Sequence, residues 1–351
     1  MGPFPDSPEF AAGLLTGGAA TLILVIAIAV FCLQFRDVYD LDHWKLNIST
    51  PLPSMWMNLG YWKSPSGEPI RHFDEACASL LREVLSTAGL LKQGGKSTRS
   101  PPQSLAILDL GIGCGDQTCE IVRLLTQQQR RRLGYVGLTL NPAQLQIAVQ
   151  RVDRELAATA EADEKVQVGP LNLFCMDAAK PEAWPDQVRS AVEALADESF
   201  AERWLLGLDC LYHFSPSRRP ILDYAARKLG ANVVAFDLLL NESSYWRDVI
   251  LARAVGVLMR CPWKTFLTKE EYKEQLVASG YERGSVVFRD VSEEVFPGLV
   301  AFLDGQDQSL AKYGISLGGG FRLARKTFRW FGTTKVIRAV VVVAHVDRGV
   351  A

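Results

Sequence analysis

From Leu105 onward, short apolar runs alternate with segments whose apolar residues recur at helical spacing. The apolar runs predict strands at 105–110, 135–140, 171–176, 203–209 and 233–240. The segments between them predict helices at about 116–127, 143–159, 186–198 and 217–229. Two later β-rich stretches, 284–291 and 335–346, predict antiparallel strands at an edge. Together these elements predict a doubly wound α/β fold, with a mostly parallel seven-stranded sheet covered by helices on both faces.

The N-terminal region has a different pattern. Residues 11–33 contain no charged side chain, and such a stretch is long enough to cross a bilayer core as a helix. A buried core helix and a cleaved signal peptide are the alternatives, but signal peptides begin with positive charge and no basic residue precedes Arg36. We therefore predict a short tail, 1–10, and a retained single-pass transmembrane helix, 11–33. Because basic residues favour the cytosolic side of a membrane helix, Arg36 predicts that the chain after the helix lies in the cytosol. The membrane could be that of the endoplasmic reticulum.

A polar connector, 34–54, leads to the main domain at 55–351. Its first part, 55–104, contains the aromatic-rich stretch MWMNLGYWK and a helical pattern at 69–89. An aromatic-rich insertion at 241–283 follows the fifth strand, and within it Thr268 and Glu271 have the spacing of a capping box. The basic segment 321–331 predicts an amphipathic helix, either lying on an anionic membrane surface or packed beside the sheet.

Charge and cysteine content narrow the functional class. A net charge of −1 over 351 residues argues against nucleic acid as the main partner. The seven cysteines are scattered, odd in number and without CxxC pairs, which argues against a disulfide framework and a zinc site. The four histidines are too dispersed for a metal cluster. We predict no metal.

The most specific motif is ILDLGIGCGDQT, at 107–118. Its alternating glycines, Gly111, Gly113 and Gly115, allow a tight turn and let a ligand approach the backbone. Asp116 stands where the dinucleotide fingerprint has its third glycine, and a carboxylate there would repel a pyrophosphate. No Gly-Lys-Ser/Thr follows, so a P-loop is also absent. A nucleoside without phosphates fits this turn best, and a purely structural turn is the alternative.

This motif resembles the first motif of the class I S-adenosylmethionine-dependent methyltransferases. The resemblance implies S-adenosylmethionine as the cofactor, with its amino-acid part held by Asp109, Gly111, Gly113 and Gly115. The next strand ends YVGLTLNPAQ, at 135–144, without the acidic residue that bonds ribose in many nucleotide sites.

That stretch resembles G-[LI]-T-L-S-x-x-Q, found in a branch that includes cyclopropane and mycolic-acid synthases and the tocopherol and sterol methyltransferases. The resemblance implies that Thr139 and Gln144 contact the cofactor. Asn141 replaces the serine of that pattern. It either contacts the cofactor or caps the following helix.

Two further strand ends carry candidate residues. By the same resemblance, Asp177 contacts the adenine amino group and Met176 packs on its ring, although Asp177 could instead cap a turn. Tyr212 and His213 follow the fourth strand, where catalytic groups gather in such sheets. His213 acts as a general base or packs against the cofactor. The cyclopropane synthases carry Glu-His here, so Tyr212 makes cyclopropanation doubtful.

Four aromatic residues complete the predicted site. Tyr61 and Trp62 match a segment near the cofactor in this branch and are either part of a lid or packed in the core. Tyr245 and Trp246 lie in the insertion that lines the acceptor pocket of related enzymes. These features predict methyl transfer to a small apolar acceptor, with O-methylation of a polyketide- or terpenoid-like metabolite in secondary metabolism favoured. The alternatives are C- or N-methylation of a sterol or other lipid, and a non-catalytic membrane scaffold that retains the fold.

Overall fold

A computed structural model describes residues 8–34, 50–91, 104–126, 132–162 and 168–347. The chain divides into two compact units. One contains residues 1–52 and the short segment 311–315, and the other contains residues 53–310 and 316–351. The second unit contains the β-sheet and is called the sheet unit below. The predicted connector, 34–54, lies largely outside the described residues.

In the first unit, Pro8–Gln34 forms one helix, α1. It covers the apolar stretch predicted as a transmembrane helix at 11–33. Within the described part of the chain, no helix is long and apolar enough to span a membrane. The side chains of residues 28–34, within the predicted segment, lie outside the description. The predicted anchor is therefore not confirmed.

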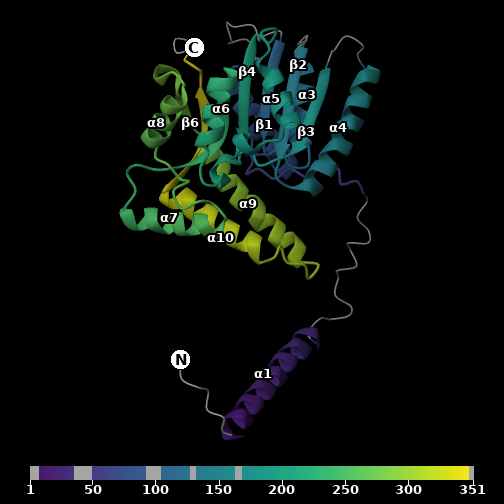
Figure 1. Cartoon of the computed structure of the whole chain (residues 1–351), viewed down its shortest axis with the longest axis vertical. Coiled ribbons are helices and arrows are strands. Elements are labelled where there is room, and N and C mark those ends of the chain that lie inside the picture. Colours follow the sequence, from purple (N-terminus) through teal and green to yellow (C-terminus); the bar gives the residue numbers. More distant parts are fainter. Residues whose placement is uncertain (1–7, 35–49, 92–103, 127–131, 163–167, 348–351) are drawn as a thin grey trace. The chain divides into compact units, whose positions relative to one another are not determined.

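The sheet has seven strands in the order β3-β2-β1-β4-β5-β7-β6 (Figure 1). The strands are β1 Ser104–Leu110, β2 Arg132–Thr139, β3 Val168–Cys175, β4 Glu202–Leu208, β5 Asn232–Leu240, β6 Val287–Asp290 and β7 Ile337–Ala344. Strands β1 to β5 are parallel, as predicted, whereas β7 is antiparallel to both β5 and β6. The prediction of a mostly parallel sheet is thus corrected to a mixed sheet, because β7 enters between β5 and β6 in the opposite direction.

Helices cover both faces of this sheet (Figure 1). They are α2 Phe73–Thr87, α3 Asp116–Thr126, α4 Pro142–Ala162, α5 Asp186–Glu193, α6 Arg219–Leu229, α7 Trp246–Leu258, α8 Lys269–Ser279, α9 Ser292–Ala311 and α10 Gly319–Thr334. Alternate strand residues point to opposite faces, so the interior forms two cores. One core joins the sheet to α2, α3, α9 and α10, and the other joins it to α5, α6 and α8.

The contacts of α8 and α10 bear on two predictions made from the sequence. Thr268 and Glu271 form the predicted capping box at the start of α8. In α10, Phe328 and Phe331 are buried in the core, while Arg325 and Arg329 form ion pairs with Asp304 of α9. The helix therefore packs beside the sheet, which was the second of its two predicted roles.

A buried polar network fixes the segment that follows β4. Arg218 forms an ion pair with Asp237 of β5, and Tyr272 of α8 donates a hydrogen bond to the same carboxylate at 3.1 Å. Arg218 also donates to Thr265, whose hydroxyl donates to the backbone oxygen of Tyr212. Buried charges require such partners, since an unpaired charge in the interior is costly. The network therefore holds the single helical turn Leu211–His213 in place beside the carboxyl end of β4.

Candidate functional site

The glycine turn between β1 and α3 is possible only without side chains. Gly111, Gly113 and Gly115 have φ angles of +73°, +56° and +89°, which L-residues with side chains rarely adopt. A Cβ atom on Gly111 would lie 2.9 Å from the Cβ of Cys210, and one on Gly115 would lie 2.8 Å from the Cα of Ala148. The turn thus brings the backbone of motif 107–118 against the segment after β4 and against α4.

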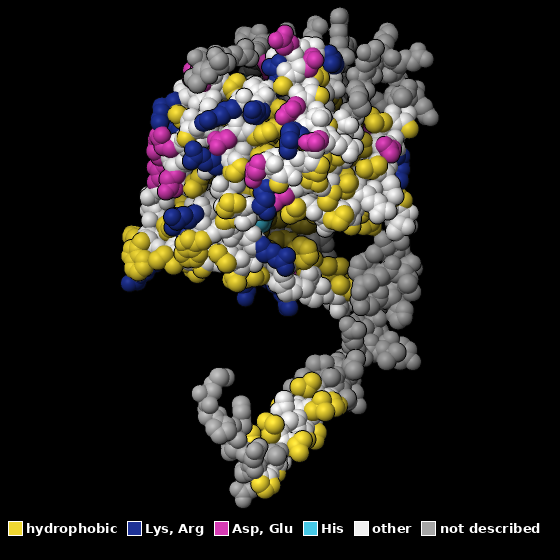
Figure 2. All heavy atoms as spheres, viewed as in Figure 1, with side chains coloured by type: hydrophobic (Ala, Val, Ile, Leu, Met, Phe, Trp, Pro, Cys, Tyr) yellow, Lys and Arg dark blue, Asp and Glu magenta, His cyan; other side chains and the backbone are white. Residues whose placement is uncertain are grey.

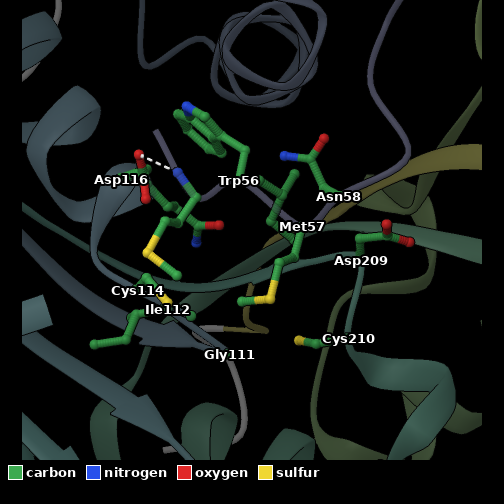
Figure 3. A pocket seen from close by; sticks show the side chains of 13 residues that line it. Trp56, Met57, Asn58, Gly111, Ile112, Cys114, Asp116, Asp209 and Cys210 are labelled. Carbon is green, nitrogen blue, oxygen red and sulfur yellow. Dashed lines mark hydrogen bonds between the residues drawn. The ribbon is translucent and has the colours of Figure 1, made fainter. Parts of the chain in front are cut away.

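A small cavity of about 90 Å³ lies on this turn, at the carboxyl ends of β1 and β4. Figure 3 shows the side chains around it. Its lining comes from three segments of the chain: Met55, Trp56, Met57 and Asn58; Gly111, Ile112, Gly113, Cys114, Asp116 and Gln117; and Leu208, Asp209 and Cys210. Ligands of parallel α/β sheets bind at this edge. The sequence prediction of a ligand at the glycine turn therefore coincides with a cavity.

The segment Pro53–Leu59, here called the strap, crosses the cavity. At one end, the backbone N–H of Met55 donates to Oδ1 of Asp116 at 3.1 Å, and Arg151 donates to the carbonyl of Pro53 at 2.9 Å. At the other end, the backbone N–H of Leu59 donates to Oδ2 of Asp209 at 2.8 Å. Two carboxylates of the cavity wall thus hold the strap over the turn.

Met57, in the middle of the strap, fills space above the turn. Its methyl carbon, Cε, lies 2.7 Å from where a Cβ of Gly113 would be. Its sulfur lies 3.6 Å from Nε2 of Gln144. Ligand sites usually enclose about 300–1,000 Å³, so the cavity of about 90 Å³ is small for a nucleoside while Met57 lies there. A nucleoside-sized ligand must displace this side chain.

The charges around the cavity favour a cation. Asp116 and Asp209 are its ionisable carboxyl groups, and no lysine or arginine is among its lining residues. Oδ2 of Asp116 is buried and has no hydrogen-bond partner in the described part of the chain. A buried acceptor without a partner is rare in folded proteins and calls for an explanation. Arg151 is paired with Oδ1 of Asp116 at 3.1 Å, which leaves Oδ2 to a positively charged ligand, whereas a phosphate would meet no positively charged side chain in the lining.

Asp209 was not predicted as a site residue. It directly follows β4 with a φ of +61°, and it accepts hydrogen bonds from Leu59 N–H and, at 2.7 Å, from the Tyr212 hydroxyl. Burial raises the pKa of its carboxyl to about 7, and the two hydrogen bonds oppose that rise. The available signal was an acidic residue at the end of the fourth predicted strand.

Asp109 lies beneath the turn, outside the cavity lining. It is fully buried in β1, where it accepts hydrogen bonds from Gln117 and from the Tyr135 hydroxyl. Burial raises its pKa to about 7 as well. Its described partners hold the turn from below, so its predicted contact with a cofactor stays a prediction.

The end of β2 places its three predicted residues together. The Thr139 hydroxyl donates to Oε1 of Gln144 at 2.9 Å, and Gln144 reaches Met57 of the strap. Oδ1 of Asn141 accepts hydrogen bonds from Ala143 N–H and Gln144 N–H, at 2.9 and 3.3 Å. Asn141 therefore caps α4, in agreement with one of its two predicted roles. Thr139 and Gln144 form a polar pair beside the place that Met57 fills.

Asp177 and Met176 follow β3 and lie outside the cavity lining. Oδ1 of Asp177 accepts a hydrogen bond from Ala179 N–H at 3.0 Å, and Oδ2 forms an ion pair with Lys180. The predicted turn-capping role of Asp177 is thus present in the structure. The contacts of Asp177 and Met176 with adenine stay predictions.

Tyr212 and His213 differ in what they can do. Tyr212 is buried and donates its hydroxyl to Asp209; burial raises its pKa well above 10, so it stays protonated and acts as a support. Nδ1 of His213 lies 3.3 Å from the sulfur of Cys261. Desolvation lowers the His213 pKa from 6.5, so its imidazole is neutral at pH 7 and able to accept a proton. Of these two side chains, His213 is the one that can act as a base.

The four predicted aromatic residues lie outside the cavity lining. Tyr61 and Trp62 are buried, and Trp62 packs over Gly298 of α9, so both follow the packed-core alternative of their prediction. Tyr245 and Trp246 are exposed at the start of α7. The part of the aromatic-rich stretch that covers the cavity is instead the strap, whose residues Met55 to Asn58 precede Tyr61 in the sequence.

No family model and no curated protein matches the chain. Solved structures do match it. The [4+2]-cyclase SpnF has 16% identity and a TM-score of 0.50, over 84% of this chain and 89% of that chain. The cyclopropane synthase MmaA2 from Mycobacterium tuberculosis has 13% identity and a TM-score of 0.51, over 83% and 90%. Phosphoethanolamine N-methyltransferase 2 of Haemonchus contortus, solved with S-adenosyl-L-methionine, has 15% identity and a TM-score of 0.51, over 77% and 53%.

The chain has the fold of the S-adenosylmethionine-dependent methyltransferases. The predicted fold is thereby confirmed, and it includes a structural likeness to a cyclopropane synthase. The SpnF match indicates that this fold also serves a cyclase, so the likeness alone does not assign a reaction.

We predict that Met57→Ala tightens the binding of S-adenosylmethionine by about tenfold, because the free protein no longer has to empty the cleft before binding. Isothermal titration calorimetry would measure this change. Met57→Leu, which keeps a similar volume, serves as the control and should bind as the wild type does. Weaker binding by the alanine variant would mean that Met57 packs against the bound cofactor and does not take its place.

The raised pKa of Asp209 predicts a pH dependence of cofactor binding. As the pH rises through about 7, this carboxyl loses its proton and attracts a cationic ligand more strongly, so the affinity for S-adenosylmethionine should increase from pH 6 to pH 8. Asp209→Asn should flatten that profile in calorimetric titrations. Asp223→Asn is the control, since Asp223 lies on α6, pairs with Arg219 and lies outside the lining. If the Asp223 variant flattened the profile equally, the assignment to Asp209 would be wrong.

Proposed function

We propose that this protein is an S-adenosylmethionine-dependent methyltransferase that acts on a small apolar metabolite. The observation that carries the proposal is the cavity on the glycine turn, which has two carboxylates, no lysine or arginine, and one buried carboxylate oxygen without a described partner. S-adenosylmethionine is a nucleoside without phosphates and carries positive charge on its sulfonium and ammonium groups. These properties match both the shape of the turn and the charge of the wall.

The residues present fit this cofactor. Gly111 and Gly113 leave room for a ligand against the backbone, and Asp116 offers a free acceptor oxygen to a cationic group. Thr139 and Gln144 offer a hydroxyl and an amide for ribose, once Met57 has moved from Gln144. When bound, S-adenosylmethionine supplies a methyl group that is already activated by its positively charged sulfur.

The protein's own contribution is mainly alignment. Because the leaving group is activated, positioning of an acceptor beside the methyl group accounts for much of the expected acceleration. His213, neutral at pH 7, would take the proton from an acceptor hydroxyl. This chemistry favours O-methylation, with a polyketide- or terpenoid-like metabolite as the acceptor. C- or N-methylation of a sterol or other lipid is the alternative.

We further propose that the sheet unit works in a reducing compartment such as the cytosol. The cysteines that the structure describes are all unpaired: Cys77, Cys114, Cys119, Cys175, Cys210 and Cys261. Free cysteines are usual in proteins of the cytosol, whereas secreted proteins commonly pair them.

Binding of S-adenosylmethionine by the full-length protein tests the proposal directly. Calorimetric titration should show binding by the wild type and none by Gly113→Asp, because an added carboxylate side chain at φ +56° would strain the turn and fill the cleft. Gly320→Asp is the matched control, because a Cβ there meets nothing within 4 Å. No binding by the wild type would remove the enzyme assignment and favour a scaffold. If binding is found, mass spectrometry of extracts from cells with and without the protein identifies the acceptor by its gain of one methyl group.

With the acceptor known, His213→Ala separates a base from a packing role. Loss of a general base should lower kcat by roughly 10²- to 10⁴-fold while the affinity for S-adenosylmethionine stays unchanged. His213→Gln, which keeps polarity and much of the volume, should be impaired to the same degree. Near-normal turnover by the alanine variant would exclude an essential base and point to an acceptor atom that needs no deprotonation.

A further inference from the structure

Helix α7 exposes large apolar side chains on the side opposite its buried residues. Trp246, Ile250 and Val257 recur at spacings of four and seven residues, and Leu251 and Leu258 recur at seven, so all five lie on one side of the helix. They are all exposed, whereas Ala252 and Gly256, on the other side, are buried. Figure 2 shows hydrophobic side chains gathered where Figure 1 places α7.

These side chains are strongly exposed for large apolar residues. Tyr245, Trp246 and Leu258 are 80%, 67% and 74% exposed. Trp263, in the loop after the helix, is exposed as well. Contiguous apolar patches on soluble proteins usually mark a contact with another molecule. We call this set the α7 surface: Tyr245, Trp246, Ile250, Leu251, Val257, Leu258 and Trp263.

Positive charge accompanies the α7 surface. Arg247, Arg260 and Lys264 are exposed, and none of them forms an ion pair within the described part of the chain. The guanidinium of Arg247 lies 5.3 Å from the ring centre of its neighbour Trp246. Between residues 243 and 269 the sequence has one acid, Asp248, which by helical spacing lies away from the exposed apolar side. The surface is therefore apolar and cationic together.

We propose that the α7 surface docks on an anionic lipid bilayer. Tryptophan and tyrosine favour the boundary between hydrocarbon and water, because their rings are apolar with one polar group. Basic residues beside them are attracted to the negative surface of anionic leaflets. A protein partner would have to present a broad apolar face and unpaired carboxylates at once, whereas an anionic bilayer presents both everywhere. Charge complementarity therefore favours lipid as the occupant.

The α7 surface is connected to the candidate site through the loop that follows the helix. Cys261 contacts His213, and Thr265 donates a hydrogen bond to the backbone of Tyr212. An acceptor dissolved in the bilayer would thus reach the protein beside the proposed base. This connection rests on the proposed function, but docking of the α7 surface does not.

Cosedimentation of the full-length protein with vesicles tests the proposal. The probes are vesicles of phosphatidylcholine alone and of phosphatidylcholine with phosphatidylserine. The wild type should bind the anionic vesicles at least about tenfold more tightly, since three exposed basic residues accompany the apolar side chains. The triple variant Arg247→Glu/Arg260→Glu/Lys264→Glu should lose this preference. The double variant Trp246→Ser/Leu258→Ser should bind both kinds of vesicle more weakly than the wild type.

The control carries the same charge change elsewhere on the sheet unit. Arg71→Glu/Arg154→Glu/Lys228→Glu reverses three other basic residues, all exposed, and should keep the lipid preference of the wild type. All variants retain the rest of the chain, so differences between them report on the substituted residues alone. Thermal unfolding and S-adenosylmethionine binding of each variant show whether the fold is intact.

Two results would overturn the proposal. One is a lipid preference that survives charge reversal at α7, or that the control variant loses equally. The other is a wild type that is dimeric in analytical ultracentrifugation, together with a Trp246/Leu258 variant that is monomeric but binds vesicles as the wild type does. That result would assign the surface to a second copy of the chain. Lipid preference without S-adenosylmethionine binding would refute the proposed function and leave the docking surface standing.

Discussion

Close backbone approach at the β1–α3 turn is the constraint on which the candidate site depends. A Cβ on Gly111 would meet Cys210, one on Gly115 would meet Ala148, and one on Gly113 would meet Met57. Two walls of the cavity, from the end of β4 and from the strap, and the neighbouring helix α4 are therefore positioned by the absence of side chains in a single turn. A larger residue at any of these positions would displace one of these segments, and with it either the polar pair at the start of α4 or the carboxylate after β4.

The two carboxylates of the cavity hold the strap and also face the space for a ligand, and their geometry makes these two roles compatible. Asp116 binds the strap and Arg151 through Oδ1 and leaves Oδ2 without a described partner, so Oδ2 can receive a cation while the strap stays attached. Asp209 uses both oxygens, one for Leu59 of the strap and one for Tyr212. Its neutral or charged state therefore affects the strap and the ligand together. Of the groups around the cavity, Met57 is the one that must move for a nucleoside, and its flexible side chain permits that movement.

Periodicity and turn chemistry were enough to predict the five parallel strands, the helices between them and the glycine turn, because these depend on local sequence. The sequence did not reveal which aspartate faces the cavity. Asp109 and Asp209 both stand at strand ends, but Tyr135 from the neighbouring strand captures the first, while a φ of +61° turns the second toward the strap. Likewise, Trp62 is removed from the site by packing on Gly298, a contact between segments far apart in the chain. Such long-range contacts leave no local pattern.

The orientation of α7 was likewise not predictable from local sequence, but the structure gives its physical cause. Its sequence is apolar on every side, so helical periodicity does not indicate which side faces the core. The small residues of α7 determine which side of the helix faces the core. A Cβ on Gly256 would lie 2.8 Å from the ring of Phe266, so only the Ala252–Gly256 side fits against the buried aromatic residue. The bulky residues are then directed outward by exclusion, although they are the more hydrophobic ones. An aromatic-rich insertion beside an active site therefore does not have to line the pocket: where the core admits only small side chains, the same composition builds an outer surface.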